Sequence, residues 1–193
     1  MEEFYSLRGE GFHAGKPAYF LRIGGCDVGC HWCDVRESWD ASRFPPVDVS
    51  GIILRADQFP AKAVVVTGGE PLLYNLDPLC WGLRERKIAL HLETSGSETL
   101  SGEWDWICLS PKKEAPPLPE IVALADELKV VVEDFSDFDR AEEIAEKIRP
   151  GCLLYLQPEW SIRDSIVPLI VKYIQSHPKW RISLQSHKYI GIP

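Results

Sequence analysis

Residues 18–34, AYFLRIGGCDVGCHWCD, join an apolar run directly to three closely spaced cysteines. Ala18–Ile23 is rich in aromatic and aliphatic residues, which predicts a β-strand. Cys26, Cys30 and Cys33 follow in a Cys-x3-Cys-x2-Cys pattern, on what we predict to be a loop. Iron–sulfur clusters are ordinarily closed by four thiolates, so three thiolates leave one iron of a 4Fe–4S cluster open to a substrate or cofactor. This stretch therefore predicts a catalytic cluster at the end of a strand.

Clustered cysteines can also hold zinc or form disulfides. Zinc sites usually add a second Cys-x2-Cys pair or a His-x3–5-His pair, and neither follows here. His31 lies between two of the cysteines and cannot easily turn onto the same metal. Cys80, Cys108 and Cys152 stand singly in apolar stretches, as small buried hydrophobic residues do. An iron–sulfur site is the favoured interpretation.

Length and charge limit the remaining classes of function. The 193 residues, 45% of them hydrophobic, predict one domain over 1–193. A net charge of −8 disfavours a phosphate-binding face, so we expect no nucleic-acid partner. The acidic start Met1-Glu2-Glu3 lacks a signal region and no run is long enough to span a membrane. Because cluster thiols must stay reduced, we expect a cytoplasmic protein without membrane contact.

Strands and helices alternate along the chain. After Ala18–Ile23, the predicted strands are Ala63–Thr67, Ile88–Glu93, Trp106–Leu109, Glu127–Val132, Cys152–Leu156 and Arg181–Leu184. The predicted helices are Ser50–Phe59 with Ser50 as its cap, Leu76–Arg86, Pro119–Ala125, Asp137–Ile148 with Ser136 as its cap, and Ile162–His177. This alternation predicts an α/β fold with a parallel sheet. Since a full eight-stranded barrel usually needs about 250 residues, we expect an open, partial TIM-like barrel of about six core strands with reduced helices.

Polar or glycine-bearing motifs follow several predicted strands, where barrel enzymes carry their active sites. In Gly68-Gly69-Glu70-Pro71, two glycines let the backbone approach a ligand, and the carboxylate can accept a hydrogen bond from an ammonium group. Ser110-Pro111-Lys112 and Gln157-Pro158 offer hydrogen bonds suited to a ribose or an adenine edge. Each motif is also a common turn. Its position after a strand is what favours a ligand-binding role.

Three features near the chain ends are informative. Arg22 is a charge within the apolar Tyr19–Ile23, and both an internal ion pair and a clamp for a substrate carboxylate remain open. Residues 4–11 are polar and glycine-rich, and we expect them to form a loop. His187–Pro193 ends stiff and apolar, a composition compatible with a tail that folds back and presents its own carboxylate.

Together these residues resemble the radical S-adenosylmethionine (SAM) enzymes, and among them the 7-carboxy-7-deazaguanine synthases. The matching stretches are Tyr5–Gly11, Phe20–Arg22, the cysteine loop, Thr67–Pro71, Glu93–Gly96, Ser110–Lys112, Gln157–Pro158 and His187–Pro193. The resemblance implies a lyase that converts 6-carboxy-5,6,7,8-tetrahydropterin to 7-carboxy-7-deazaguanine with loss of ammonia, in queuosine and deazapurine biosynthesis. It further implies a 4Fe–4S cluster, SAM as a regenerated cofactor, an assisting Mg²⁺ ion, an electron donor such as flavodoxin or ferredoxin, and a homodimer.

The resemblance also implies roles for individual residues. The catalytic cluster ligands are Cys26, Cys30 and Cys33. The SAM-binding positions are Gly69, Glu70, Ser95, Ser110, Pro111, Lys112, Gln157, Pro158, Glu159 and Trp160. The pterin-binding positions are Leu7, Arg8, Gly9, Glu10, Arg22, Thr67, His187 and Pro193.

Two positions depart from the family pattern. Arg8 stands where members often have glutamine, so the resemblance does not specify the side-chain contact at this position. Val35 stands where many members have a threonine whose hydroxyl ligates magnesium. Valine offers no oxygen, and a hard cation needs oxygen ligands. Asp34, Glu37 or Ser38, or the substrate and water, are the remaining candidates to hold the ion.

Other classes of function share parts of this pattern. An activase that makes a glycyl radical on a partner protein uses the same cluster, but it needs a broad cleft that a tail ending at Pro193 would obstruct. A non-catalytic iron–sulfur electron carrier normally has four cysteines. Such a carrier also has no use for Gly68-Gly69-Glu70-Pro71. A zinc-binding interaction module is a further alternative, which metal analysis would separate from an iron–sulfur protein.

Overall fold

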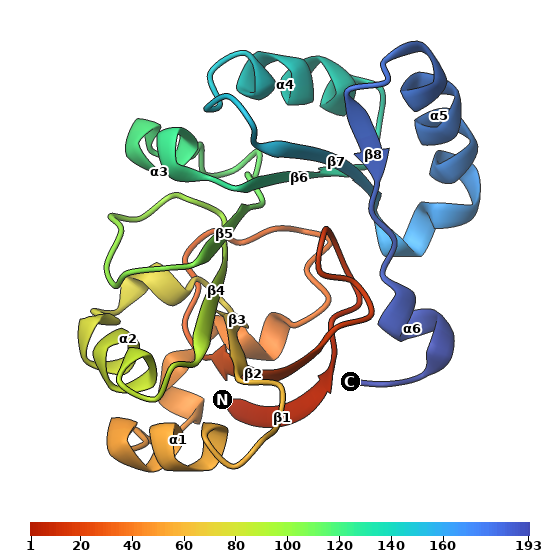
Figure 1. Cartoon of the computed structure of the whole chain (residues 1–193). Helices are drawn as coiled ribbons and strands as arrows, with labels where there is room; N and C mark the ends of the chain where they lie inside the picture. Colours follow the sequence, from red (N-terminus) through yellow and green to blue (C-terminus); the bar gives the residue numbers. More distant parts are fainter.

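The computed structural model describes all 193 residues, and its strands form one sheet that follows the chain order (Figure 1). The strands are β1 (Glu2–Leu7), β2 (Pro17–Ile23), β3 (Ala63–Gly68), β4 (Ala89–Thr94), β5 (Trp106–Leu109), β6 (Glu127–Val132), β7 (Leu153–Pro158) and β8 (Trp180–Ile182). β1 is antiparallel to β2, and β2 to β8 are parallel. Because β8 does not pair with β1, the curved sheet is an open barrel.

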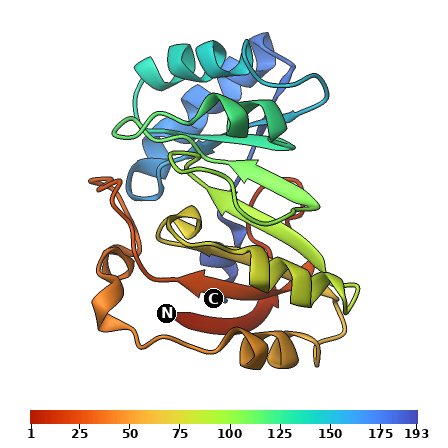
Figure 2. The ribbon, with the colours of Figure 1, turned by 90° about the vertical axis from the view of Figure 1, so that its left-hand side faces the viewer.

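Helices cover the outside of this curved sheet (Figures 1 and 2). They are α1 (Val49–Ala56), α2 (Asp77–Arg84), α3 (Pro119–Leu124), α4 (Ser136–Ala145) and α5 (Arg163–Ser176), with short 3-10 turns η1 (Arg36–Trp39), η2 (Ala41–Arg43), η3 (Pro71–Leu73) and η4 (Trp160–Ile162). A sixth helix, α6 (Ser186–Ile190), follows β8 and bonds to the segment after β1, where Ser186 donates to the Gly9 carbonyl at 2.9 Å. None of the helices is both long and apolar enough to cross a membrane.

The apolar strands explain the parallel sheet. All six residues of β6 are buried, and Val64, Val65 and Val66 of β3 are buried too. Strands covered on both faces favour such continuous apolar runs, because helices lie on one side and barrel side chains on the other. One hydrophobic cluster of 29 buried residues extends from Tyr19 to Trp180 along the chain. The core therefore holds the strand ends in fixed positions around the barrel mouth.

The structure confirms the open, partial barrel and corrects several details of the prediction. Residues 4–7 of the predicted loop 4–11 belong to the edge strand β1. The parallel part of the sheet has seven strands, β2 to β8, where about six core strands were expected, and β1 adds an antiparallel strand at its edge. The cap of α1 is Asp48, which accepts from the Gly51 amide at 3.0 Å, so Ser50 is not the cap. Ser136 is the first residue of α4, and its amide donates to Asp134 at 2.8 Å, so it does not cap that helix either.

Candidate active site

Two adjoining cavities open inside the barrel. The first, which we call the cysteine cavity, has a volume of about 210 Å³ and contains the side chains of Cys26, Cys30 and Cys33 in its lining. The second, the tail cavity, has a volume of about 420 Å³ and is lined by residues of β1, β2 and the C-terminal tail. Six residues line both cavities: Glu10, Asp34, Thr67, Gly68, Glu93 and Gln185. Ligands in the two cavities would therefore lie side by side.

The cysteine loop is held against the turn after β3 by backbone contacts. The Gly69 amide donates to the Ile23 carbonyl at 2.9 Å, and the Glu70 amide donates to the Gly25 carbonyl at 2.8 Å. A Cβ atom at Gly69 would lie 1.9 Å from the Gly25 oxygen, so only glycine fits there. Gly68 has a φ of 130°, which L residues rarely adopt. The paired glycines thus bring two backbones into close contact at the cavity wall.

The residues of the cysteine cavity fit a 4Fe–4S cluster. All three cysteines are free thiols that line one cavity from one loop. No three cysteine, histidine or acidic side chains are close enough together for one metal ion. A cluster binds each cysteine at a different iron, so it requires a wider arrangement. Burial raises the pKa of the Cys30 thiol to about 11, so cluster binding must displace its proton.

Glu70 connects the ends of β3 and β4. Its carboxylate is 1% exposed. It accepts hydrogen bonds from the Leu72 amide (3.1 Å), the Thr94 hydroxyl (2.6 Å), and both the amide and the hydroxyl of Ser95 (2.8 and 2.5 Å). Each oxygen already has two internal donors. The carboxylate therefore fixes the loop after β4 at the cavity wall.

The structure brings together most, not all, of the positions expected to bind SAM. The positions that line the cysteine cavity are Gly69, Glu70, Ser95, Ser110, Lys112 and Gln157. Pro111, Pro158, Glu159 and Trp160 are not among its lining residues. Glu159 instead accepts from the amides of Ser161 and Ile162 and caps η4. Burial lowers the pKa of Lys112, whose ammonium donates to the carbonyl and hydroxyl of Ser110 at 2.7 Å.

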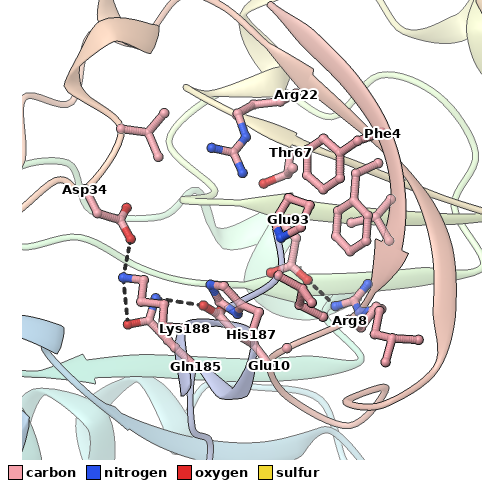
Figure 3. A pocket seen from close by; sticks show the side chains of 18 residues that line it. Phe4, Arg8, Glu10, Arg22, Asp34, Thr67, Glu93, Gln185, His187 and Lys188 are labelled. Atoms are coloured by element: carbon pink, nitrogen blue, oxygen red, sulfur yellow. Dashed lines mark hydrogen bonds and ion pairs between the residues drawn. The ribbon is translucent and has the colours of Figure 1, made fainter. Parts of the chain in front are cut away.

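All eight positions expected to bind the pterin line the tail cavity: Leu7, Arg8, Gly9, Glu10, Arg22, Thr67, His187 and Pro193. Figure 3 shows Arg22 and Thr67 on one side of the cavity, with Gln185, His187 and Lys188 opposite them. The Nε atom of Arg22 lies 3.1 Å from the Glu2 carboxylate, and its guanidinium lies 5.6 Å from the centre of the Phe4 ring. This ion pair is partly exposed, so it leaves the guanidinium at the cavity wall.

A buried chain of charges forms the wall between the two cavities. Arg8 and Lys129, 4% and 5% exposed, both pair with Glu93. The Lys129 ammonium lies 2.9 Å from Glu93 and 2.6 Å from Glu10, which also accepts from Gln185 at 2.9 Å. Burial alone would raise the pKa of Glu93, but the charges of Lys129 and Arg8 lower it to about 2. Glu93 is therefore a hydrogen-bond acceptor at neutral pH.

The C-terminal tail is anchored beside this wall. The Ser6 hydroxyl donates to the Pro193 carbonyl oxygen at 3.2 Å, and the Ser186 amide donates to the Gly9 carbonyl at 2.9 Å. A Cβ atom at Gly9 would lie 2.0 Å from the Nδ1 atom of His187, so this glycine leaves room for the tail to close. The chain end thus forms part of the cavity.

Sequence and structure comparisons agree on the relatives of this chain. The radical SAM superfamily matches residues 21–130. The 7-carboxy-7-deazaguanine synthase of Flavobacterium psychrophilum is 51% identical to this chain, and the match covers the whole chain and 91% of the relative. The 7-carboxy-7-deazaguanine synthase of Synechocystis is 48% identical, and the match covers 99% of this chain and 91% of the relative. The chain belongs to the 7-carboxy-7-deazaguanine synthase family. The crystal structure of QueE from Escherichia coli superposes with a TM-score of 0.82 at 28% identity, covering 96% of this chain and 92% of that one.

This member of the 7-carboxy-7-deazaguanine synthase family has valine at position 35, and Asp34, Glu37 and Ser38 are the candidate oxygen donors beside it in the sequence. Val35 itself lines the tail cavity. The buried Ser38 hydroxyl donates to the Val35 carbonyl at 2.7 Å, and Glu37 lines neither cavity. Asp34 lines both cavities, and its carboxylate lies 2.6 Å from the Lys188 ammonium. Ser38 lines only the cysteine cavity, so of the three side chains considered as magnesium ligands Asp34 alone lines the tail cavity.

Sequence reasoning did not single out Glu93, Lys129, Gln185 or Lys188 as site residues. Lys129 is a charge within the apolar strand Glu127–Val132, which is the signal that drew attention to Arg22. Applied to each strand, that signal would have found Lys129. Gln185 and Lys188 belong to the segment that returns to the barrel. The composition of the tail indicated such a return, but which of its side chains face the site depends on non-local contacts.

Proposed function

We propose that this radical SAM enzyme converts 6-carboxy-5,6,7,8-tetrahydropterin to 7-carboxy-7-deazaguanine with loss of ammonia. The observation that carries the proposal is the contact between the cysteine cavity and the tail cavity, which share six lining residues. SAM beside the cysteines would then meet a substrate held by the tail. Relatives that carry the synthase name and are similar over the full chain support the substrate class.

In the cysteine cavity, Cys26, Cys30 and Cys33 would hold three irons of a 4Fe–4S cluster and leave the fourth for SAM. The bound cluster supplies the electron that cleaves SAM and starts hydrogen abstraction from the substrate. The backbone at Gly69 and the hydroxyl of Ser110 would position SAM from the strand ends. Rigid mounting of this kind supplies selectivity, because the reacting atoms are held in one geometry.

Five of the expected SAM residues act differently in this proposal. Glu70 would hold the Ser95 loop in place through its internal hydrogen bonds instead of contacting the ammonium group of SAM. Pro111, Pro158 and Glu159 would shape the turns after β5 and β7, because they do not line the cavity. Trp160 also lies outside the lining, where its ring contacts Tyr189 and so supports the tail.

The tail cavity suits a flat, charged substrate. Its volume of about 420 Å³ falls within the usual range for small-molecule sites, about 300–1,000 Å³. Phe4 and Phe20, stacked 5.0 Å apart, give it an apolar wall. Arg22 would bind the substrate carboxylate, while Glu10 and Glu93 would accept hydrogen bonds from ring N–H groups. Thr67 and His187 complete the polar lining.

We also propose that the chain folds as a single domain and works as a cytoplasmic homodimer. An electron donor such as flavodoxin or ferredoxin would reduce its cluster. These proposals rest on the family pattern and on six free thiols, which a reducing compartment preserves.

The test is product formation by anaerobically reconstituted enzyme with SAM, a chemical reductant and the tetrahydropterin. Mass spectrometry should detect 7-carboxy-7-deazaguanine and ammonia. Cys30→Ala should abolish formation of both products. Cys80→Ala should retain it, because Cys80 lies in the hydrophobic core and does not line the cysteine cavity. Cleavage of SAM without any change in the pterin would contradict the proposed substrate and favour the activase alternative, which a glycyl-radical assay on a partner protein would then detect.

A further inference from the structure

A lysine from the tail reaches across to the cysteine loop. The Lys188 ammonium lies 2.6 Å from the Asp34 carboxylate and 3.1 Å from the side-chain oxygen of Gln185 (Figure 3). It also lies 5.0 Å from the centre of the Trp160 ring. Lys188 is 19% exposed, and both ends of the ion pair line the tail cavity. The Lys188 ammonium therefore places a positive charge in the proposed pterin site, beside Asp34, which lines both cavities.

The side chains around this lysine do not fit a magnesium ion. Val35 has no oxygen, and the buried Ser38 hydroxyl already bonds to a backbone carbonyl. Three side-chain carboxylates line the tail cavity, and each is already paired with a cation of the chain. Glu10 and Glu93 pair with the buried Lys129, and Glu93 also pairs with Arg8. Asp34 pairs with the Lys188 ammonium. Magnesium requires a near-octahedral shell of oxygen ligands. A divalent cation at Asp34 would also be repelled by the adjacent ammonium.

We propose that the Lys188 ammonium, held by Asp34, supplies in this chain the positive charge that a magnesium ion would otherwise bring to the pterin. The inference deepens the proposed function and rests on it. An ammonium has three N–H donors, and Asp34 and Gln185 take two of them. The third can donate to a carbonyl or carboxylate oxygen of the substrate. Such a charge-assisted bond stabilises negative charge on that oxygen without a metal.

The test measures pterin binding, not turnover. Reconstituted enzyme with SAM and without reductant is titrated with the tetrahydropterin by calorimetry, once with added Mg²⁺ and once with a chelator. We expect equal affinities for the wild-type chain. Lys188→Met should weaken binding by about 10–100-fold, the usual effect of losing a hydrogen bond to a charged group. The matched control is Lys172→Met, a change of an exposed lysine on α5.

A double variant tests whether pterin binding can be made dependent on magnesium. Val35→Thr with Lys188→Met restores the hydroxyl and removes the ammonium, so its pterin affinity should rise with Mg²⁺. Mn²⁺ serves as a spectroscopic probe, because its paramagnetic resonance broadens when it is bound. The spectrum should stay that of free Mn²⁺ with the wild-type complex and broaden with the double variant. Circular dichroism confirms that each variant is folded.

The outcomes separate the two proposals. Wild-type binding that weakens with the chelator and recovers with Mg²⁺, or a broadened Mn²⁺ spectrum with the wild-type complex, would overturn the role of Lys188 and leave the proposed function intact. Full pterin affinity in the folded Lys188→Met variant would overturn it as well. No pterin binding by the wild-type chain under either condition would overturn the proposed function, and with it this inference.

Discussion

Replacing Lys129 by methionine removes the central cation of the wall between the two cavities. Lys129 lies on β6, almost fully buried, and pairs with Glu10 at 2.6 Å and Glu93 at 2.9 Å. Methionine keeps most of the aliphatic stem but not the charge. Glu93 would still pair with Arg8, whereas Glu10 would lose its ion-pair partner and keep only the hydrogen bond from Gln185. Lys129→Met therefore leaves excess negative charge in the barrel.

The size of the effect follows from that geometry. Removing one partner of a buried ion pair typically costs about 3–5 kcal/mol, and in proteins of this length each kcal/mol lowers the melting temperature by about 2–4 °C. We expect Lys129→Met to lower the melting temperature by about 6–20 °C. Adding Glu10→Gln should recover part of the loss, because the uncompensated carboxylate is then neutral.

Thermal unfolding at neutral pH, followed by circular dichroism, measures this effect. The control is Lys172→Met, which replaces an exposed lysine with no ion-pair partner and should change the free energy of unfolding by no more than about 0.5 kcal/mol. If Lys129→Met melts at the same temperature as the control, the buried network does not stabilise the barrel and the reasoning fails.

Three further predictions concern the cavities and the pH dependence. Gly69→Ala places a Cβ atom 1.9 Å from the Gly25 oxygen, so SAM affinity by equilibrium dialysis should fall; unchanged affinity would show that the turn can move. Deleting Pro193 shortens the tail by one residue, about 3.3–3.6 Å, and should weaken pterin binding in calorimetry while SAM binding persists. Burial and the nearby Arg8 charge lower the pKa of both His13 and His91 to about 4. The unfolded chain takes up these protons near pH 6.5, whereas the folded chain does so only near pH 4. The free energy of unfolding in urea should therefore be highest above pH 6.5 and fall towards pH 4, and a free energy that does not change over this range would contradict the prediction.

Strong local patterns made much of the fold predictable. The strands Trp106–Leu109 and Glu127–Val132 have the expected bounds, because apolar runs between turns specify them. The sequence does not predict β1, because Glu2, Glu3 and Ser6 interrupt its apolar residues and because its antiparallel pairing with β2 is set by register across the β1–β2 turn. The cap of α1 was misassigned because Asp48 and Ser50 both suit a cap, and the Ser50 hydroxyl in fact bonds to Asp48.

In the site, too, local patterns were predictable and non-local contacts were not. Sequence spacing singled out the cysteines, and the family pattern singled out eight positions that all line the tail cavity. Charge partners were not predictable, since Arg8, Glu93 and Lys129 come together only when distant strands pair around the barrel. Trp160 follows a strand that borders the site but points to the tail, and side-chain direction is not encoded in spacing alone.

Hydrogen transfer between the two cavities tests most directly whether SAM and the pterin meet inside this barrel. The enzyme is incubated anaerobically with SAM, a reductant and tetrahydropterin deuterated at its ring C–H positions, and the recovered SAM is analysed by mass spectrometry. If the shared wall holds the two ligands side by side, deuterium should appear in the adenosyl 5′ carbon of SAM while 7-carboxy-7-deazaguanine accumulates. Cleavage of SAM with no deuterium transfer and no product would contradict the assignment of the tail cavity as the pterin site.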